Sequence, residues 1–203
     1  MTLPPDADAR VARVAAKTAL LVVDVQEAAV APGLYEGEAV LANIAELVAL
    51  CRERAVEVVF VQHDGEPGSA YEPGTPGWPI HAAVRPRPEE RVVRKRTNSA
   101  FRGTDLRAHL DRRGVRTLVV VGLHTELCVD TTCRVAFEHG FDVVVPEMTN
   151  TTFDNGELTA RQIYELYNRR IFGGRFARVS TMDEARALLT TAGRRVTDAR
   201  GVG

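Results

Sequence analysis

Short runs rich in Val and Leu alternate along the chain with longer segments whose apolar residues recur every three or four positions. The run TALLVVDV at 18–25 is almost continuously apolar, which is typical of a strand buried on both faces of a parallel sheet. Further strands are predicted at residues 56–62, 91–95, 117–123, 142–145 and 176–179. Helical periodicity predicts helices at residues 38–54, 105–113, 126–139, 158–170 and 183–192.

The alternation of strands and helices predicts an α/β fold. We expect one domain, residues 1–203, with three layers (α-β-α) around a mostly parallel six-stranded sheet. Residues 63–90 interrupt the alternation with six prolines and four glycines, so they are predicted to form a long irregular loop. Loops of this length in a compact domain are usually functional or disordered. Residues 194–203 are predicted to form a frayed tail.

Composition narrows the classes of function. The net charge is −1, so no excess of basic residues indicates nucleic acid or an anionic membrane surface. No apolar run approaches the ~20 residues of a transmembrane helix. The N-terminal segment contains acidic residues and no long apolar core, unlike a secretory signal. Three irregularly spaced cysteines indicate free thiols, so we expect a cytoplasmic protein.

Three reactive residue types fall at the ends of predicted strands. Asp24 nearly ends the first strand, Lys95 ends the third, and Cys128 follows the fourth. Ligands bind beyond the C-terminal ends of the strands in an open parallel sheet, so these positions are candidates for a site. Each also has an ordinary interpretation. Asp24 could cap a loop or helix, Lys95 could belong to a solvated charge cluster, and Cys128 could be a small core residue.

Lysine usage favours a function for Lys95. The chain contains 24 arginines and only two lysines. Lys17 precedes the first strand and is expected to be solvated, whereas Lys95 stands between two arginines at a strand end. Arginine and lysine differ where a compact ammonium is required, so the lysine at this position points to chemistry.

Cys128 differs from the other two cysteines in its position. Thr125 suits a helix N-cap, and Cys128 falls in the first turn that follows. The amides at a helix N-terminus are expected to lower the pKa of a thiol there. Cys51 lies on the apolar face of its helix, and Cys133 is on a different helix face from Cys128, so both are expected to be structural. No C-x-x-C pair or zinc-ligand spacing is present.

Together the three strand-end residues would make a nucleophilic site. Asp24 would take the thiol proton of Cys128, Lys95 would hold the pair ionised, and the thiolate would attack a carbonyl carbon. Backbone amides at the start of the helix would stabilise the resulting oxyanion.

Three motifs are similar to those of cysteine hydrolases of the isochorismatase-like superfamily: LLVVDVQ at 20–26, VVRKRTNSAF at 92–101 and VVGLHTELCVDTTCRVAFEHGFDVVV at 120–145. The resemblance implies a catalytic triad of Asp24, Lys95 and Cys128. It also implies a non-proline cis peptide at Leu123–His124, which would direct the amides of His124 and Cys128 into an oxyanion hole. Assembly as a homodimer or homotetramer is a further implication.

Within the superfamily, the motifs CVDTTCR, TNTTFD and LTARQI most resemble streptothricin hydrolase-like and related amidohydrolases. Nicotinamidases are also similar, but their metal site uses Asp-x-His after the second strand, where this chain has His63 and Gly65. His81 matches the third ligand position and is expected to hydrogen-bond within the loop instead. We therefore expect no metal and no other cofactor.

The predicted substrate is a small molecule, with no nucleic-acid or membrane partner. Residues predicted to contact it are Trp78, His63, Phe153 and Glu126. Three of them have a structural alternative: loop packing for Trp78, a backbone hydrogen bond for His63, and a favourable helix-dipole position for Glu126. Further candidates for an aromatic pocket wall are Tyr35, Tyr71 and Phe101, although Phe101 is more simply a core residue.

The favoured function is hydrolysis of an amide, lactam or imide C–N bond through a thioester on Cys128. An isochorismatase-type enol-ether hydrolase is one alternative, disfavoured because those members generally lack this cysteine. A non-catalytic binding domain is the other alternative, since a fold does not by itself fix a function.

Overall fold

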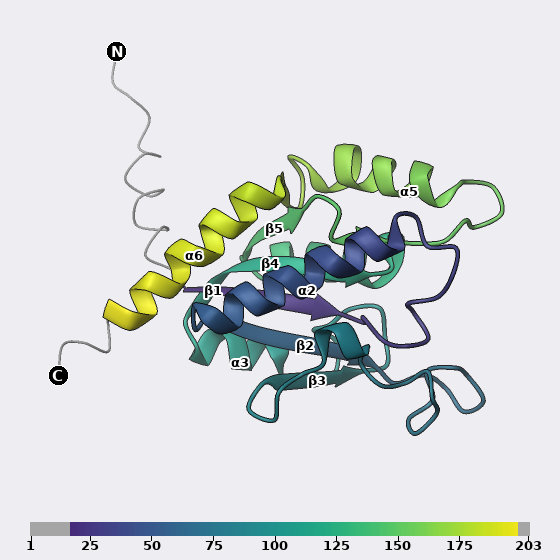
Figure 1. Cartoon of the computed structure of the whole chain (residues 1–203), viewed down its shortest axis with the longest axis horizontal. Coiled ribbons are helices and arrows are strands. Elements are labelled where there is room, and N and C mark those ends of the chain that lie inside the picture. Colours follow the sequence, from purple (N-terminus) through teal and green to yellow (C-terminus); the bar gives the residue numbers. More distant parts are fainter. Residues whose placement is uncertain (1–16, 199–203) are drawn as a thin grey trace, which may run out of the picture.

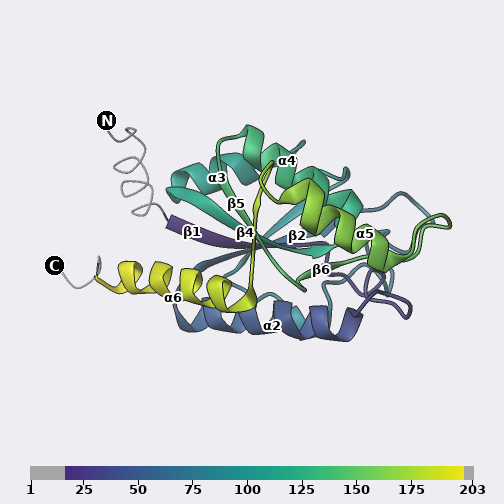
Figure 2. The same ribbon diagram turned by 90° about the horizontal axis from the view of Figure 1, so that it is seen from above.

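The computed structural model describes residues 17–198, with side chains described as far as residue 193. Within them a seven-stranded parallel sheet lies between two layers of helices (Figures 1 and 2). The strand order is β3-β2-β1-β4-β5-β7, and β6 pairs with the end of β4. The strands are β1 (Lys17–Val23), β2 (Glu57–His63), β3 (Arg91–Lys95), β4 (Val115–Leu123), β5 (Asp142–Pro146), β6 (Asn150–Thr151) and β7 (Arg178–Ser180).

Helices cover both faces of the sheet. Figure 2 shows α2 (Gly37–Glu53) and α6 (Met182–Asp198) on one face, with α3 (Leu106–Arg112), α4 (Asp130–Glu138) and α5 (Ala160–Leu166) on the other. Alternate residues of β1 enter the two cores, as the two-residue repeat of a strand requires. Leu20 and Val22 pack on the α2 and α6 side, whereas Leu21 and Val23 pack on the α3 and α4 side. The continuous apolar run of this strand therefore reflects burial on both faces.

The predicted α/β architecture is confirmed, and the predicted number of strands is corrected from six to seven. The additional strand, β6, has only the two polar residues Asn150 and Thr151, which carry no hydrophobic pattern. The first strand ends at Val23, because Asp24 has a φ of 50° and leaves the extended conformation. The loop at 63–90 contains one short 3₁₀ turn, η1 (Ala82–Val84).

Two predicted helices begin or end in wider π-helical turns. The segment predicted at 126–139 consists of η2 (Thr125–Val129) followed by α4, and the segment at 158–170 consists of α5 followed by η3 (Tyr167–Phe172). Residues 194–203 are expected to fray, but α6 continues to Asp198. Its close approach to the end of α2 requires Gly193, where a Cβ would lie 2.3 Å from the carbonyl oxygen of Arg54. Residues 199–203 lie outside the described part.

None of the described helices is both long and apolar enough to cross a membrane.

Candidate active site

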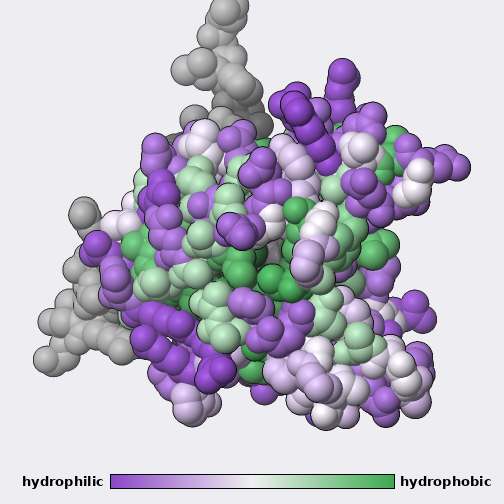
Figure 3. Space-filling model, turned by 45° about the vertical axis from the view of Figure 1, so that its right-hand side comes forward, coloured by the Kyte–Doolittle hydropathy of each residue, from purple (hydrophilic) through white to green (hydrophobic). Residues whose placement is uncertain are grey.

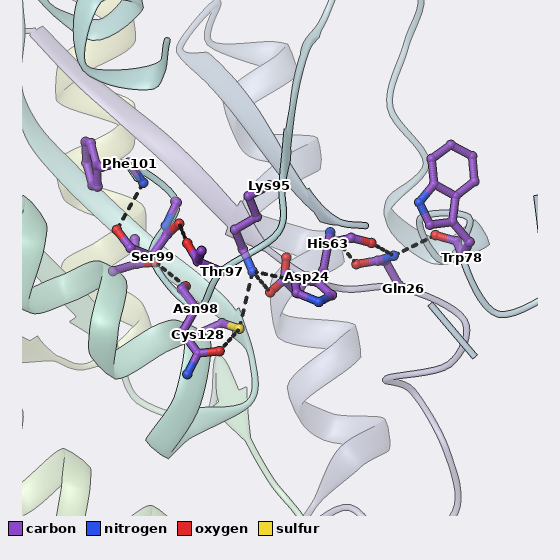
Figure 4. A network of polar contacts seen from close by, with 12 residues as sticks. Asp24, Gln26, His63, Trp78, Lys95, Thr97, Asn98, Ser99, Phe101 and Cys128 are labelled. Atoms are coloured by element: carbon purple, nitrogen blue, oxygen red, sulfur yellow. Dashed lines mark hydrogen bonds and ion pairs between the residues drawn. The ribbon is translucent and has the colours of Figure 1, made fainter. Parts of the chain in front are cut away.

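The ends of β1, β3 and β4 bring the three predicted catalytic residues together. Nζ of Lys95 lies 2.6 Å from Oδ2 of Asp24 and 3.3 Å from Sγ of Cys128 (Figure 4). Lys95 reaches Asp24 across the end of β2, which separates β3 from β1 in the sheet. Seen with the right-hand side of Figure 1 turned forward, the surface is hollowed near its centre, and hydrophobic residues border the hollow (Figure 3). The polar cluster therefore lies at the strand ends, where a parallel sheet places its ligands.

Tight backbone packing positions Asp24. Its amide donates to the carbonyl of Val61 on β2 (3.0 Å), and its positive φ turns the chain away from the strand. Aspartate tolerates this left-handed conformation better than most residues. On the other side of β1, a Cβ at Gly122 would lie 2.0 Å from the carbonyl oxygen of Val23. The φ of Gly122 is 134°, so glycine is needed there both for space and for conformation.

Asp24 and Lys95 form a buried ion pair. The Lys95 side chain is 0% exposed and that of Asp24 is 6% exposed. Burial raises the pKa of Asp24, and the neighbouring Lys95, Cys128 and His63 offset part of that rise. A carboxylate with a raised pKa is a stronger base than one in water, which suits removal of a thiol proton.

The thiol of Cys128 is protonated at rest. Burial, followed by the negative charge of Asp24, raises its pKa to about 12, although Lys95 acts in the opposite direction. The prediction of a lowered thiol pKa from the helix N-terminus is therefore wrong. The dipole effect is smaller than the cost of placing a thiolate in a buried pocket beside a carboxylate. A base close to the thiol is consequently required, and the candidate is the Asp24 carboxylate, which contacts the same Lys95 ammonium as the Cys128 sulfur.

His63 completes the surroundings of the Lys95 ammonium. Its Nδ1 lies 3.3 Å from Nζ of Lys95. An ammonium only donates hydrogen bonds, so Nδ1 is the acceptor and the ring proton is on Nε2. Burial and the positive charge of Lys95 lower the pKa of His63, in keeping with a neutral ring. Lys95 therefore contacts the carboxylate of Asp24, the sulfur of Cys128 and the imidazole of His63.

Gln26 ties the long loop to the strand ends, a role that the sequence reasoning missed. Its buried amide donates to the carbonyls of His63 (3.0 Å) and Trp78 (2.7 Å) and accepts from the amide of His63 (2.8 Å). The sequence feature that could have indicated this role is the place of Gln26 at the end of the LLVVDVQ motif. The two partners lie 37 and 52 residues away in sequence, so the pairing itself could not be predicted.

Asn98 was also missed. Its side chain is exposed, and Oδ1 lies 3.8 Å from Sγ of Cys128, on the opposite side from Lys95 (Figure 4). The position three residues after Lys95 in the VVRKRTNSAF motif was the available signal.

The predicted substrate contacts lie around this cluster. The Trp78 indole N–H donates to Asp64 (2.9 Å), and the Arg94 guanidinium lies 5.1 Å from its ring centroid, so this side chain packs the loop. The ring of Phe153 lies 5.2 Å from that of His124. Glu126 accepts a hydrogen bond from Thr152 (2.9 Å), and its other carboxylate oxygen is buried without a partner in the described chain. Contact of Trp78, His63, Phe153 and Glu126 with a substrate stays a prediction.

The turn that carries Cys128 has the expected backbone. The Leu123–His124 peptide bond is cis. The carbonyl of His124 accepts from the amides of Leu127 (3.1 Å) and Val129 (3.2 Å), which flank Cys128. Stabilisation of an oxyanion by the amides of His124 and Cys128 remains a prediction.

The residues present do not fit a nicotinamidase-type metal site. Nδ1 of His63 is engaged by Lys95, and Gly65 offers no ligand. Nδ1 of His81 accepts from the amide of Ala83 (3.2 Å), which confirms the predicted hydrogen bond within the loop. Among the side chains that the structure describes (residues 17–193), no three from His, Cys, Asp or Glu are grouped as metal ligands.

Comparisons with known proteins agree with this arrangement. Residues 18–184 match the family described as "Isochorismatase domain". The chain is 45% identical over 138 residues to a streptothricin hydrolase from Streptomyces noursei, covering 67% of this chain and 50% of that protein. It is 31% identical over 208 residues to the ureidoacrylate amidohydrolase RutB of Variovorax paradoxus, and the match covers 84% of this chain and 80% of that protein.

The fold is also found among solved structures. An isochorismatase-family protein from Chromobacterium violaceum superimposes with a TM-score of 0.81 at 34% identity, covering 85% of this chain and 93% of that one. The match to the streptothricin hydrolases spans only about half of their length. The match to the family over most of the chain is nevertheless sufficient to assign it: the protein belongs to the isochorismatase family.

Proposed function

We propose that this protein is a cysteine amidohydrolase that cleaves a C–N bond of a small-molecule amide, lactam or imide. The observation that carries the proposal is the buried Lys95 ammonium, held between the Asp24 carboxylate and the Cys128 sulfur. A buried carboxylate, ammonium and thiol in mutual contact are costly to maintain in a core, and they supply the base and nucleophile of acyl transfer.

The reaction begins with transfer of the Cys128 thiol proton to Asp24. The thiolate then attacks the carbonyl carbon, and the tetrahedral oxyanion is held by the amides of His124 and Cys128. Collapse of this intermediate breaks the C–N bond, and Asp24 returns its proton to the departing nitrogen. Water attacks the thioester next, with Asp24 taking one water proton. Release of the acid then restores the thiol of Cys128.

Lys95 makes these proton transfers compatible with burial. Its ammonium offsets part of the rise in the pKa of both Asp24 and Cys128. Positive charge at this point stabilises whichever of the two groups is ionised during the cycle. Lys95 therefore acts on both the base and the nucleophile.

The names of the relatives support the substrate class. One is a streptothricin hydrolase and another a ureidoacrylate amidohydrolase. Both names are compatible with hydrolysis of an amide-type substrate. The presence of Cys128 disfavours the enol-ether hydrolase alternative. We further propose a single catalytic domain, a cytoplasmic location, assembly as a homodimer or homotetramer, and activity without a metal or other cofactor.

A substrate screen with a cysteine control tests the proposal. Primary amides, lactams and ureido compounds are incubated with the wild-type protein, Cys128→Ala and Cys133→Ala, each with and without a chelator. We expect turnover by wild type and Cys133→Ala, none by Cys128→Ala, no effect of the chelator, and an acyl adduct on Cys128 by mass spectrometry. Hydrolysis by Cys128→Ala at the wild-type rate would contradict the covalent mechanism.

A further inference from the structure

The 63–90 loop returns to the end of β2 and places Tyr71 beside the triad. The amide of Gly65 donates to the carbonyl of Tyr71 (2.8 Å), which holds this part of the loop against the strand end. The Tyr71 ring meets His63 edge to face, with ring centroids 5.9 Å apart and an interplanar angle of 88°. Because His63 in turn contacts Lys95, the phenol stands one side chain away from the catalytic ammonium.

Gly65 makes this approach possible. A Cβ on Gly65 would lie 2.3 Å from Oγ of Ser69 and 2.8 Å from Cβ of Tyr71. The φ of Gly65 is outside the left-handed region, so glycine is required here for space and not for backbone conformation. Any other residue would displace the segment that carries Tyr71. The space beside Gly65 is filled by the loop residues Ser69 and Tyr71.

The Tyr71 hydroxyl is available to a ligand. Tyr71 is half-buried, and its hydroxyl makes no hydrogen bond with the side chains described, which end at residue 193, or with the described backbone. Burial, together with the nearby charges of Asp24 and Cys128, raises the pKa of Tyr71. The phenol therefore stays protonated at neutral pH and can both donate and accept a hydrogen bond.

We propose that Tyr71 is a substrate-binding residue whose hydroxyl hydrogen-bonds the amide group of the substrate above Cys128, and that Gly65 is required to place it there. This inference rests on the proposed amidohydrolase function. It assigns to the irregular loop a direct part in recognising the amide, through a neutral phenol beside His63.

Alkylation of Cys128 by two probes tests the proposal without requiring a known substrate. Iodoacetamide carries a primary amide, whereas methyl methanethiosulfonate carries none. Rates are measured at pH 8 from the labelled Cys128 peptide, and the ratio of the two rates cancels any change in thiol ionisation. Variants are Tyr71→Phe, Gly65→Ala and the double variant. Matched controls are Tyr167→Phe and Gly173→Ala, where a Cβ would meet only ordinary contacts, the nearest at 3.6 Å.

The ratio is the alkylation rate with iodoacetamide divided by the rate with methyl methanethiosulfonate. Loss of one neutral hydrogen bond to the amide should lower this ratio about five-fold in Tyr71→Phe. Gly65→Ala should give a similar fall, and the double variant should be no worse than the worse single variant, because both act through one hydroxyl. The controls should keep the wild-type ratio. An unchanged ratio in Tyr71→Phe, or multiplied losses in the double variant, would overturn the proposal. Absence of amide turnover in the wild type would instead count against the proposed function, while the alkylation ratio still decides the role of Tyr71.

Discussion

The buried Asp24–Lys95 pair makes a sharp prediction for Lys95→Met. The substitution keeps a long side chain but leaves the Asp24 carboxylate buried without its ammonium. Removing one partner of a buried ion pair costs about 3–5 kcal/mol. Arg91→Met is the matched control, because Arg91 lies on the same strand and pairs with Asp105 at the surface, with side chains 42% and 53% exposed. An exposed pair of this kind contributes at most about 1 kcal/mol.

The pH dependence separates this electrostatic cost from a packing defect. The pKa of Asp24 is already raised in the folded protein, and removal of Lys95 raises it further. A raised folded-state pKa means that stability is retained below the unfolded pKa and lost as pH rises through the folded pKa. The free energy of unfolding of Lys95→Met should therefore fall increasingly below that of wild type as the pH rises, by at most about 1.4 kcal/mol per pH unit. Over the three units from pH 5 to pH 8, one titrating carboxylate can add at most about 4 kcal/mol to this deficit, which is comparable with the cost of removing one partner of a buried ion pair.

Urea unfolding followed by circular dichroism at pH 5, 6, 7 and 8 measures both effects. We expect Lys95→Met to be destabilised strongly at pH 8 and much less at pH 5, while Arg91→Met stays near wild type throughout. A deficit that is independent of pH would show that lost packing, and not the buried charge, dominates. A deficit no larger than that of Arg91→Met would refute the electrostatic reasoning altogether.

Further variants test other parts of the structure. Lys95→Arg keeps the charge but cannot place one nitrogen among the three acceptors Asp24, Cys128 and His63, so kcat/KM should fall by about 100-fold, and near-normal turnover would show that any cation suffices. Because the pKa of Cys128 is raised to about 12, its alkylation rate should keep rising to at least pH 10 in a stopped-flow profile, whereas a plateau near pH 7 would contradict a protonated resting thiol. Gly122→Ala should lower the free energy of unfolding by more than about 2 kcal/mol, since its Cβ would collide with the Val23 carbonyl, and a wild-type melting temperature would argue against that close approach. Thr159→Ala removes the capping box at the start of α5 and should cost about 1 kcal/mol, with no change expected in Cys128 alkylation.

The sequence by itself determined the architecture and the identity of the chemical groups. Continuous apolar runs and three-to-four spacing were sufficient for the parallel sheet and its helices, because burial on both faces imposes that pattern directly on the residues. Strand ends in a parallel sheet share one edge, so Asp24, Lys95 and Cys128 could be assigned to one site before any contact was known. Elements without a hydrophobic pattern could not be predicted, as the two-residue strand β6 shows.

Only the tertiary structure decided the direction of the pKa shift of Cys128 and the contacts that the 63–90 loop makes with the strand ends. The position of Cys128 near a helix N-terminus predicts a lowered thiol pKa. In the folded protein, burial and the neighbouring Asp24 raise this pKa instead. Burial and distances between groups far apart in sequence depend on packing, and no local pattern encodes them. The same reason applies to Gln26, which joins the first strand to the 63–90 loop, and to Gly65, whose missing side chain admits Tyr71. The sequence thus specified which groups are present at the strand ends, and folding specified their ionisation and the residues that surround them.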